Sequence, residues 1–200
     1  MPAVTRHSQP SVPGRLLRPV VLVGIMGAGK TSVGQVLAGL LGVPFVDSDH
    51  EIEAAAGLDI PEIFARYGES AFRAGEARVI ARLLSGGPLV LATGGGAFIE
   101  PGTRALIRAR AVSVWLRAPA DLVWQRVRGR PGRPLLAVPD PRARLEALIA
   151  ERYPVYAEAD VTVDSRADEL HEAAARRIIA ALAARDAPLP PGERLFGEPQ

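Results

Sequence analysis

Gly-Ile-Met-Gly-Ala-Gly-Lys-Thr, from Gly24 to Thr31, is the stretch that decides how this 200-residue chain folds. Its pattern, G-x-x-x-x-G-K-T, is that of a phosphate-binding loop, in which glycine amides turn inward around phosphate oxygens and the lysine reaches them. The apolar run Val20–Gly24 precedes it, and Lys30–Leu41 follows with apolar residues at helical spacing. The sequence therefore supplies the strand, loop and helix that the motif requires.

Lys30 is the only lysine among the 24 basic residues of the chain. A compact ammonium suits a place among phosphate oxygens better than a planar guanidinium does, so this position favours the functional interpretation of the loop over a chance glycine turn. The residues expected to contact the phosphates of a nucleotide such as ATP are Gly27, Ala28, Gly29, Lys30, Thr31 and Ser32.

The loop also predicts a magnesium site. The Thr31 hydroxyl is expected to ligate Mg²⁺ beside the phosphates that Lys30 contacts. Asp47 and Asp49 leave the end of the second apolar run, where the ligands of open α/β sheets gather. If the extended conformation persists to residue 49, alternation points both side chains the same way. We assign Asp47 to the metal and Asp49 to the acceptor hydroxyl, which it orients and whose proton it can take. The alternative is that Asp49 only caps a helix beginning at His50.

Short apolar runs alternate along the chain with helical stretches rich in alanine and arginine. This alternation is typical of a three-layer α/β/α fold, in which helices cover both faces of a parallel sheet. Strands are expected at Val20–Gly24, Pro44–Asp47, Leu89–Ala92, Val112–Leu116 and Val161–Val163. Helices are expected at Lys30–Leu41, Asp49–Ala56, Ile60–Tyr67, Glu69–Leu84, Gly102–Arg110, Pro119–Arg128, Pro141–Ala157 and Ala167–Ala184.

The composition predicts one globular domain with a sizeable core, because 48% of the residues are hydrophobic. The formal net charge is +2 with both signs interspersed, so no nucleic-acid partner is expected. No cysteine, signal-peptide core or bilayer-length apolar run is present, and we expect a monomeric cytoplasmic protein with no membrane partner. We expect a disordered leader over 1–18, a folded domain over 19–184 and a flexible Pro-rich tail over 185–200. Three scattered histidines predict no histidine metal site: His7, His50 and His171.

The segment of about residues 128–140 is rich in Gly and Pro and carries Arg130 and Arg133 between two predicted helices. Such a segment is a candidate mobile lid over a bound nucleotide, and the alternative is an unstructured surface connection.

Three further features indicate an anion pocket. Arg73 and Glu76 lie one helical turn apart, a spacing that can hold a guanidinium in place or merely decorate a surface. The triple glycine at 94–96 follows the third expected strand and can present backbone amides to an anion or form a plain turn. Together with Arg152, these residues offer arginine forks and amides that match a carboxylate.

These motifs, in this order, resemble those of the shikimate kinase family over about residues 19–183. The resemblance implies a P-loop NTPase fold with a five-stranded parallel sheet and an enzyme that uses ATP and Mg²⁺. Its reaction transfers the γ-phosphate of ATP to the 3-hydroxyl of shikimate, giving shikimate 3-phosphate and ADP, on the route to chorismate and aromatic amino acids. The matching stretches are GIMGAGKT at 24–31, DSD at 47–49, FRxxE at 72–76, TGGGA at 93–97, RPLL at 133–136 and ERxPxY at 151–156.

The resemblance also implies roles for single residues. Asp49 corresponds to the residue that contacts the substrate hydroxyls, and Arg133 to a lid arginine that closes over the phosphates. Arg126 is similar in position to an arginine that packs against adenine, with Arg128, Arg130 and Arg166 as alternatives. The implied catalytic residues are Lys30, Asp49 and Arg133. The implied shikimate-binding residues are Asp49, Arg73, Gly94, Gly95, Gly96 and Arg152.

Two other functions stay open at this point. Another small-molecule kinase, such as a gluconate or nucleotide kinase, would share the loop, but the acidic pair, the arginines and the triple glycine argue against it. An ATP-binding regulatory module would have lost phosphate transfer, whereas Asp49 and Arg133 are intact.

Overall fold

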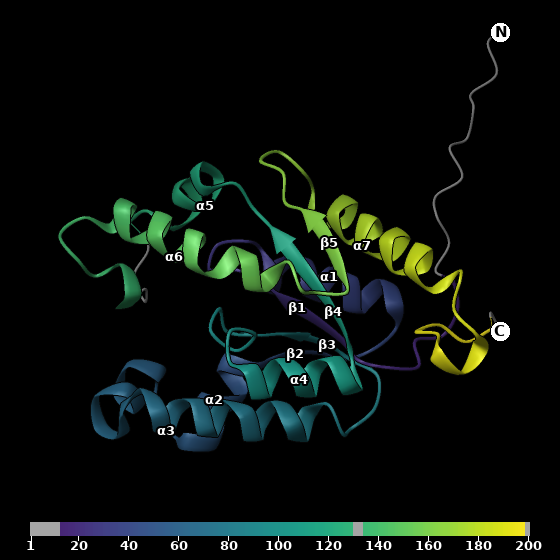
Figure 1. Ribbon diagram of the computed structural model, residues 1–200, viewed down its shortest axis with the longest axis horizontal. Coiled ribbons are helices and arrows are strands. Elements are labelled where there is room, and N and C mark those ends of the chain that lie inside the picture. The colour runs from purple at the N-terminus through teal and green to yellow at the C-terminus, as the bar shows by residue number, and fades with distance from the viewer. Residues whose placement is uncertain (1–12, 130–133, 199–200) are drawn as a thin grey trace, which may run out of the picture.

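The computed structural model describes residues 13–129 and 134–198, and all five expected apolar runs form strands of one parallel sheet. The strands follow the order β2-β3-β1-β4-β5, as Figure 1 shows at the centre of the molecule. Valine-rich runs suit a parallel sheet because helices bury both of its faces. The strand bounds are β1 Val20–Val23, β2 Phe45–Asp47, β3 Val90–Ala92, β4 Val112–Arg117 and β5 Val161–Asp164.

The register of the strands brings their carboxyl ends to one edge of the sheet. Ala92, the last residue of β3, aligns with Leu22 of β1 and with Asp47, the last residue of β2. The phosphate-binding loop, the acidic pair and the triple glycine follow these strand ends, so they emerge side by side.

Helices cover both faces of the sheet. Helix α1 packs against α7 on one face, and α4 packs against β4 on the other (Figure 1). Gly34 lets α1 approach the sheet closely, because a Cβ at this position would lie 2.6 Å from the Phe45 ring. The helix bounds are α1 Lys30–Leu41, α2 Ser48–Ala56, α3 Ile60–Leu83, α4 Pro101–Arg110, α5 Ala120–Val127, α6 Pro141–Tyr156 and α7 His171–Asp186.

The break expected between two helices near residue 68 is present. Within α3, Gly68 has φ 77° and ψ 171°, a conformation that is not helical and that favours glycine. Asp59 begins the first half with a capping box, because its side chain accepts from the Glu62 amide and the Glu62 side chain accepts from the Asp59 amide.

Helix α7 begins at His171, four residues later than expected from Ala167. Residues 165–170 instead form a loop whose backbone and side chains are engaged by arginines from other elements. Arg126 donates to the carbonyl of Arg166, and Arg177 donates to the Glu169 carboxylate. These contacts replace the hydrogen bonds that a first helical turn would make.

The flexible tail predicted over 185–200 is wrong for its described part, because residues 187–198 fold back onto the core. Leu195 and Phe196 are buried, and Phe196 forms an antiparallel bridge with Leu16. The buried carboxylate of Asp186 accepts from the amides of Leu195 and Phe196, at 2.6 and 2.8 Å. A short 3₁₀ turn, η2 at Pro191–Glu193, makes the reversal.

The same contacts shorten the predicted leader. Leu16 is 1% exposed and belongs to the hydrophobic core, so residues 13–18 are part of the folded unit, and residues 1–12 lie outside the described residues. Within residues 13–129 and 134–198, no helix combines the length and apolar character needed to cross a membrane.

The predicted lid segment is described at its two ends. Helix α5 stops at Val127, Gly129 has φ 71°, and the 3₁₀ turn η1 covers Pro134–Leu136. Leu136 is buried in the core, which anchors the end of the segment that leads into α6. Arg130 and Arg133 lie outside the described residues, so the lid and its arginine stay predictions.

Candidate active site

The phosphate-binding loop turns on three glycines with positive φ, at Gly24, Gly27 and Gly29. At Gly27, where φ is 76°, a Cβ would also lie only 2.6 Å from a methyl group of Val127. Backbone conformation and close packing thus both require glycine there. Helix α1 begins directly after the loop, so the positive end of its dipole and its first amides face the space that the loop encloses.

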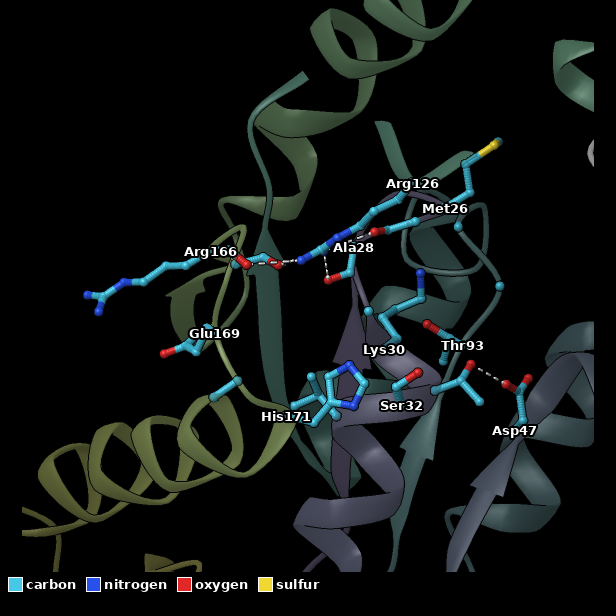
Figure 2. A pocket seen from close by; sticks show the side chains of 18 of the residues that line it. Met26, Ala28, Lys30, Ser32, Asp47, Thr93, Arg126, Arg166, Glu169 and His171 are labelled. Carbon is cyan, nitrogen blue, oxygen red and sulfur yellow. Dashed lines mark hydrogen bonds between the residues drawn. The ribbon is translucent and has the colours of Figure 1, made fainter. Parts of the chain in front are cut away.

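The Lys30 ammonium folds back over this loop. Its Nζ donates to the carbonyl oxygens of Gly24 and Ile25, at 2.8 and 3.0 Å. The side chain lines a cavity of about 540 Å³, and Figure 2 shows it beside Ser32 and Thr93. A positive charge held at the mouth of a loop of inward-facing amides suits an anionic group.

Thr31 and Asp47, the two residues predicted to hold Mg²⁺, contact each other. The Thr31 hydroxyl donates to Asp47 Oδ2 at 3.0 Å, which links the starts of α1 and α2 (Figure 2). Asp47 Oδ1 also accepts from the Asp49 amide, so Asp47 is the N-cap of α2. The alternative in which Asp49 caps a helix beginning at His50 is therefore wrong: the helix begins at Ser48, and Asp49 lies in its first turn.

The Asp49 carboxylate lies against the triple-glycine loop. A Cβ on Gly94 would be 2.6 Å from Asp49 Oδ1, so only a glycine leaves room for this carboxylate. Burial raises the pKa of Asp49, and the nearby Asp47 raises it further, while Lys30 opposes both. A carboxylate that is partly stripped of water is a better hydrogen-bond acceptor and proton acceptor than an exposed one.

Ser48 is a site residue that the sequence reasoning missed. Its side chain is fully buried, and its hydroxyl accepts from the Gly94 amide at 3.3 Å. It thereby joins the start of α2 to the triple-glycine loop. Its place between Asp47 and Asp49 could have indicated this role, because a small hydroxyl at that position can hydrogen-bond a backbone amide of a neighbouring loop without filling the site.

Arg73 packs against the last of the three glycines. A side chain on Gly96 would overlap the Arg73 guanidinium, so the arginine lies directly on the backbone of the loop. Glu76 holds it through an ion pair of 2.7 Å, and Glu69 contacts it at 3.3 Å. Glu76 is 1% exposed, and burial raises the pKa of its carboxyl against the opposing effect of Arg73. Because Glu76 is buried and only 19% of the Arg73 side chain is exposed, the pair is not the exposed surface pair of the alternative interpretation.

Arg152 approaches the middle glycine from α6. Its side chain is buried, and its Nη1 would be 3.4 Å from a Cβ on Gly95. Its Nε has no hydrogen-bond partner among the described residues. Four charged groups thus surround the glycine loop: Asp49 and Glu76 at Gly94, Arg152 at Gly95 and Arg73 at Gly96.

Arg126 connects the phosphate-binding loop to the loop after β5. Its guanidinium donates to the carbonyls of Gly27 and Ala28, to Ser165 Oγ at 2.8 Å, and to the carbonyl of Arg166 (Figure 2). Arg166 lines the same cavity, whereas the alternative Arg128 is exposed and does not line it. Arg126 therefore lines the cavity and connects two loops through hydrogen bonds. The position of Arg126 in the sequence did not predict these contacts.

The cavity joins most of the predicted site residues. It is lined by all six loop residues from Gly27 to Ser32, by both aspartates, by Gly94 and Gly95, and by Arg126. The cavity lining does not include Gly96, the last residue of the glycine loop, or Arg73 and Arg152, which pack against that loop. Arg133 lies outside the described residues. Asp49 and Gly94 thus lie where the cavity of the phosphate-binding loop meets the surroundings of the glycine loop, which carry Arg73 and Arg152.

Comparison with known proteins decides between the kinase classes that share this loop. The family model described as shikimate kinase matches residues 26–183. The chain belongs to the shikimate kinase family.

Its relatives in the shikimate kinase family are similar over most of their length. The shikimate kinase of Rhodopseudomonas palustris is 58% identical over 165 residues, which cover 82% of this chain and 81% of the relative. That of Paramagnetospirillum magneticum is 56% identical over 173 residues, covering 86% and 88%. The solved structure of a shikimate kinase from Acinetobacter baumannii in complex with shikimate is 41% identical, with a TM-score of 0.83, and the match covers 89% of this chain and 99% of that one.

Proposed function

We propose that this chain is a shikimate kinase, which transfers the γ-phosphate of ATP to the 3-hydroxyl of shikimate and releases shikimate 3-phosphate and ADP. The observation that carries the proposal is the position of Asp49, which lines the phosphate cavity and also packs against Gly94 of the glycine loop. Asp49 thus lies between the phosphate cavity and the glycine loop, which is where the acceptor hydroxyl has to meet the phosphate donor. The product would serve the synthesis of chorismate and aromatic amino acids.

In this proposal, the site has a phosphate-binding half at the cavity and a carboxylate-binding half at the glycine loop, and each half binds one substrate. The amides of the phosphate-binding loop and the Lys30 ammonium hold the β- and γ-phosphates of ATP. Arg73 and Arg152 bind the shikimate carboxylate through guanidinium forks, and the amides of Gly95 and Gly96 complete the shell, since the Gly94 amide donates to Ser48. Asp49 accepts a hydrogen bond from the 3-hydroxyl and points its oxygen at the γ-phosphorus.

Transfer then forms a bond between the 3-oxygen and the γ-phosphorus as the bond from that phosphorus to the β,γ-bridging oxygen breaks. The hydroxyl proton passes to Asp49, and the electron pair of the broken bond leaves with ADP. Lys30 stabilises the charge that develops on the migrating group and the leaving oxygen. The proposed lid arginine, Arg133, would add a second positive charge.

The residues present fit a Mg²⁺ ion. Thr31 Oγ1 and Asp47 Oδ2 lie 3.0 Å apart at the cavity wall, and oxygen ligands are those that Mg²⁺ prefers. Among the described residues, no group of three or more His, Asp or Glu side chains could hold a metal alone, which suits an ion bound mainly by phosphates and water. When bound, Mg²⁺ would neutralise charge on the β- and γ-oxygens.

The experiment that tests the proposal is coupled ADP release with shikimate, quinate or gluconate as acceptor, with and without Mg²⁺. We expect Mg²⁺-dependent turnover with shikimate and little with gluconate. Turnover with gluconate but not with shikimate would replace the proposal by the gluconate-type alternative. ATP binding without acceptor-dependent ADP release would support a regulatory module instead.

The Asp49→Ala variant tests the mechanism in the same assay, and we expect it to bind ATP but to lose most of its turnover. A rate near that of the wild type would contradict the role assigned to Asp49. The monomeric state and the cytoplasmic location stay predictions from the sequence.

A further inference from the structure

The last turns of α6 carry two tyrosines that the proposed chemistry does not use. Tyr153 and Tyr156 both pack against Trp115 of β4, with ring centroids 5.0 and 6.0 Å from the indole. Both phenolic hydroxyls donate to backbone carbonyls, but at different places. Tyr153 donates to the carbonyl of Ala118, which follows β4, whereas Tyr156 donates to the carbonyl of Gly95 at 2.5 Å.

The Tyr156 hydroxyl reaches the centre of the carboxylate-binding half. The residue is 0% exposed, and its oxygen would lie 3.6 Å from a Cβ on Gly95, close to Arg152 Nη1 at 3.4 Å from the same point. Burial raises the pKa of Tyr156 to about 12, although the neighbouring Arg152 opposes the shift. The hydroxyl therefore stays protonated, and remains a donor, at neutral pH.

A fixed carbonyl at Gly95 also fixes the next amide. The C=O of Gly95 and the N–H of Gly96 belong to one planar peptide unit and point in opposite directions. When Tyr156 holds the carbonyl on its side, the Gly96 amide turns to the other side. Other bonds hold the rest of the glycine loop: the Gly94 amide donates to Ser48, and the Ala97 and Ile99 amides donate to the carbonyls of Gly94 and Gly96. The peptide unit between Gly95 and Gly96 is the one that Tyr156 fixes.

We propose that Tyr156 is a positioning residue for the shikimate carboxylate: its hydroxyl holds the Gly95 carbonyl, thereby orients the Gly96 amide, and stands beside the Arg152 guanidinium. This inference rests on the proposed function, because it concerns the binding of shikimate. It assigns to the tyrosine of the ERxPxY stretch a task at the acceptor half and none at the nucleotide half.

The test compares Tyr156→Phe with Tyr153→Phe. Each change removes one hydroxyl that donates to a backbone carbonyl and keeps the ring in the same aromatic cluster, so each variant is expected to fold. For Tyr156→Phe we expect the KM for shikimate to rise about three- to tenfold, the usual effect of one lost hydrogen bond, and the KM for ATP to stay within about twofold. For Tyr153→Phe we expect both KM values within about twofold of the wild type.

Calorimetry of shikimate binding in the absence of nucleotide gives a second measurement. We expect the Kd for shikimate to rise by the same factor as the KM in Tyr156→Phe and to stay near the wild-type value in Tyr153→Phe. A purely structural hydroxyl would lower the Tm without separating the two KM values. The inference is overturned by a Tyr156→Phe variant with wild-type affinity for shikimate, or by an equal loss in Tyr153→Phe. Wild-type protein without shikimate-dependent ADP release would overturn the proposed function and this inference together, so the two failures can be distinguished.

Discussion

The carboxylate of Asp49 occupies the space that a side chain on Gly94 would need, since a Cβ there would lie 2.6 Å from Asp49 Oδ1 and 3.1 Å from Glu76 Oε1. Substitution of Gly94 by alanine must therefore displace the group that is proposed to orient the acceptor. A displacement of about 1 Å at a reacting group can cost about 100-fold in rate. For Gly94→Ala we expect kcat/KM for shikimate to fall about 100-fold, with the KM for ATP nearly unchanged, in steady-state assays.

The matched control for this change is Gly102→Ala in α4. No atom lies within 4 Å of a Cβ at Gly102, and the residue is helical, so alanine should stabilise the protein by up to about 1 kcal/mol and leave turnover unchanged. A Gly94→Ala variant as active as Gly102→Ala would contradict the close contact with Asp49.

Removal of the Lys30 ammonium should abolish most phosphate transfer without unfolding the protein. For Lys30→Ala we expect kcat to fall about 100- to 1,000-fold, the range found when one group that stabilises transition-state charge is removed. The control is Arg18→Ala, because Arg18 also donates to a backbone carbonyl, that of Ala109, but lies outside the cavity. Equal rates in the two variants would refute the role of Lys30, and thermal unfolding would check that both are folded.

Arg73 should affect the acceptor much more than the nucleotide. Its guanidinium lies on Gly96 and is held by the buried Glu76, so Arg73→Ala leaves a buried carboxylate without its partner. We expect the KM for shikimate to rise about 30-fold or more, because the proposed charge pair between Arg73 and the shikimate carboxylate is lost. The KM for ATP should change little.

Arg66→Ala in the same helix is the control for Arg73→Ala. Arg66 forms a surface ion pair with Glu62, with 57% and 49% of the two side chains exposed, and such pairs contribute little. An unchanged KM for shikimate in Arg73→Ala would count against the carboxylate pocket.

The buried Glu76 gives a pH dependence of stability. Burial raises the pKa of Glu76 in the folded state above 4.5, the ordinary value for a glutamate. The folded protein therefore takes up a proton at a higher pH than the unfolded chain does. Wild-type stability should therefore rise relative to Glu76→Gln as the pH falls through the folded-state pKa towards 4.5, because glutamine does not titrate. Urea unfolding of both proteins between pH 4.5 and 7 measures the difference, and a difference independent of pH would contradict the raised pKa.

The returning C-terminal segment should contribute to stability but not to catalysis. Asp186→Ala leaves two buried amides, those of Leu195 and Phe196, without an acceptor, and we expect the free energy of unfolding to fall by about 1–3 kcal/mol. Asp121→Ala, at an ion pair whose aspartate is 76% exposed, should change it by less than about 0.5 kcal/mol. If Asp186→Ala is as stable as Asp121→Ala, the segment is not held by this carboxylate.

The strands and most helices could be predicted because their signals are local. The valine-rich runs, the break at Gly68 and the start of α1 at Lys30 follow from composition and spacing within a few residues. The start of α7 and the fold of the tail could not be predicted in this way. Both depend on distant partners: Arg126 engages the loop before α7, and Leu16 pairs with Phe196 across nearly the whole chain.

The site shows the same division. Residue types and motif spacing identified Lys30, Asp49 and Arg73 correctly as neighbours of one cavity or of its adjoining loop. The sequence did not show whether Asp47 or Asp49 caps α2, because the answer depends on the residue at which β2 ends and α2 begins. The buried hydroxyl of Ser48 was missed because its partner, the Gly94 amide, comes from another strand end.

The hydrogen bonds of Lys30 to Gly24 and Ile25 have a spectroscopic consequence, because the chain contains no second lysine. Protein grown with ¹⁵N-lysine would carry a single labelled ammonium, and its signal would report only on the phosphate-binding loop. The two carbonyls that now hold this ammonium compete with any incoming phosphate for its protons. Titration with nucleotide would therefore follow the exchange of carbonyl for phosphate at one atom, with no background from the rest of the molecule.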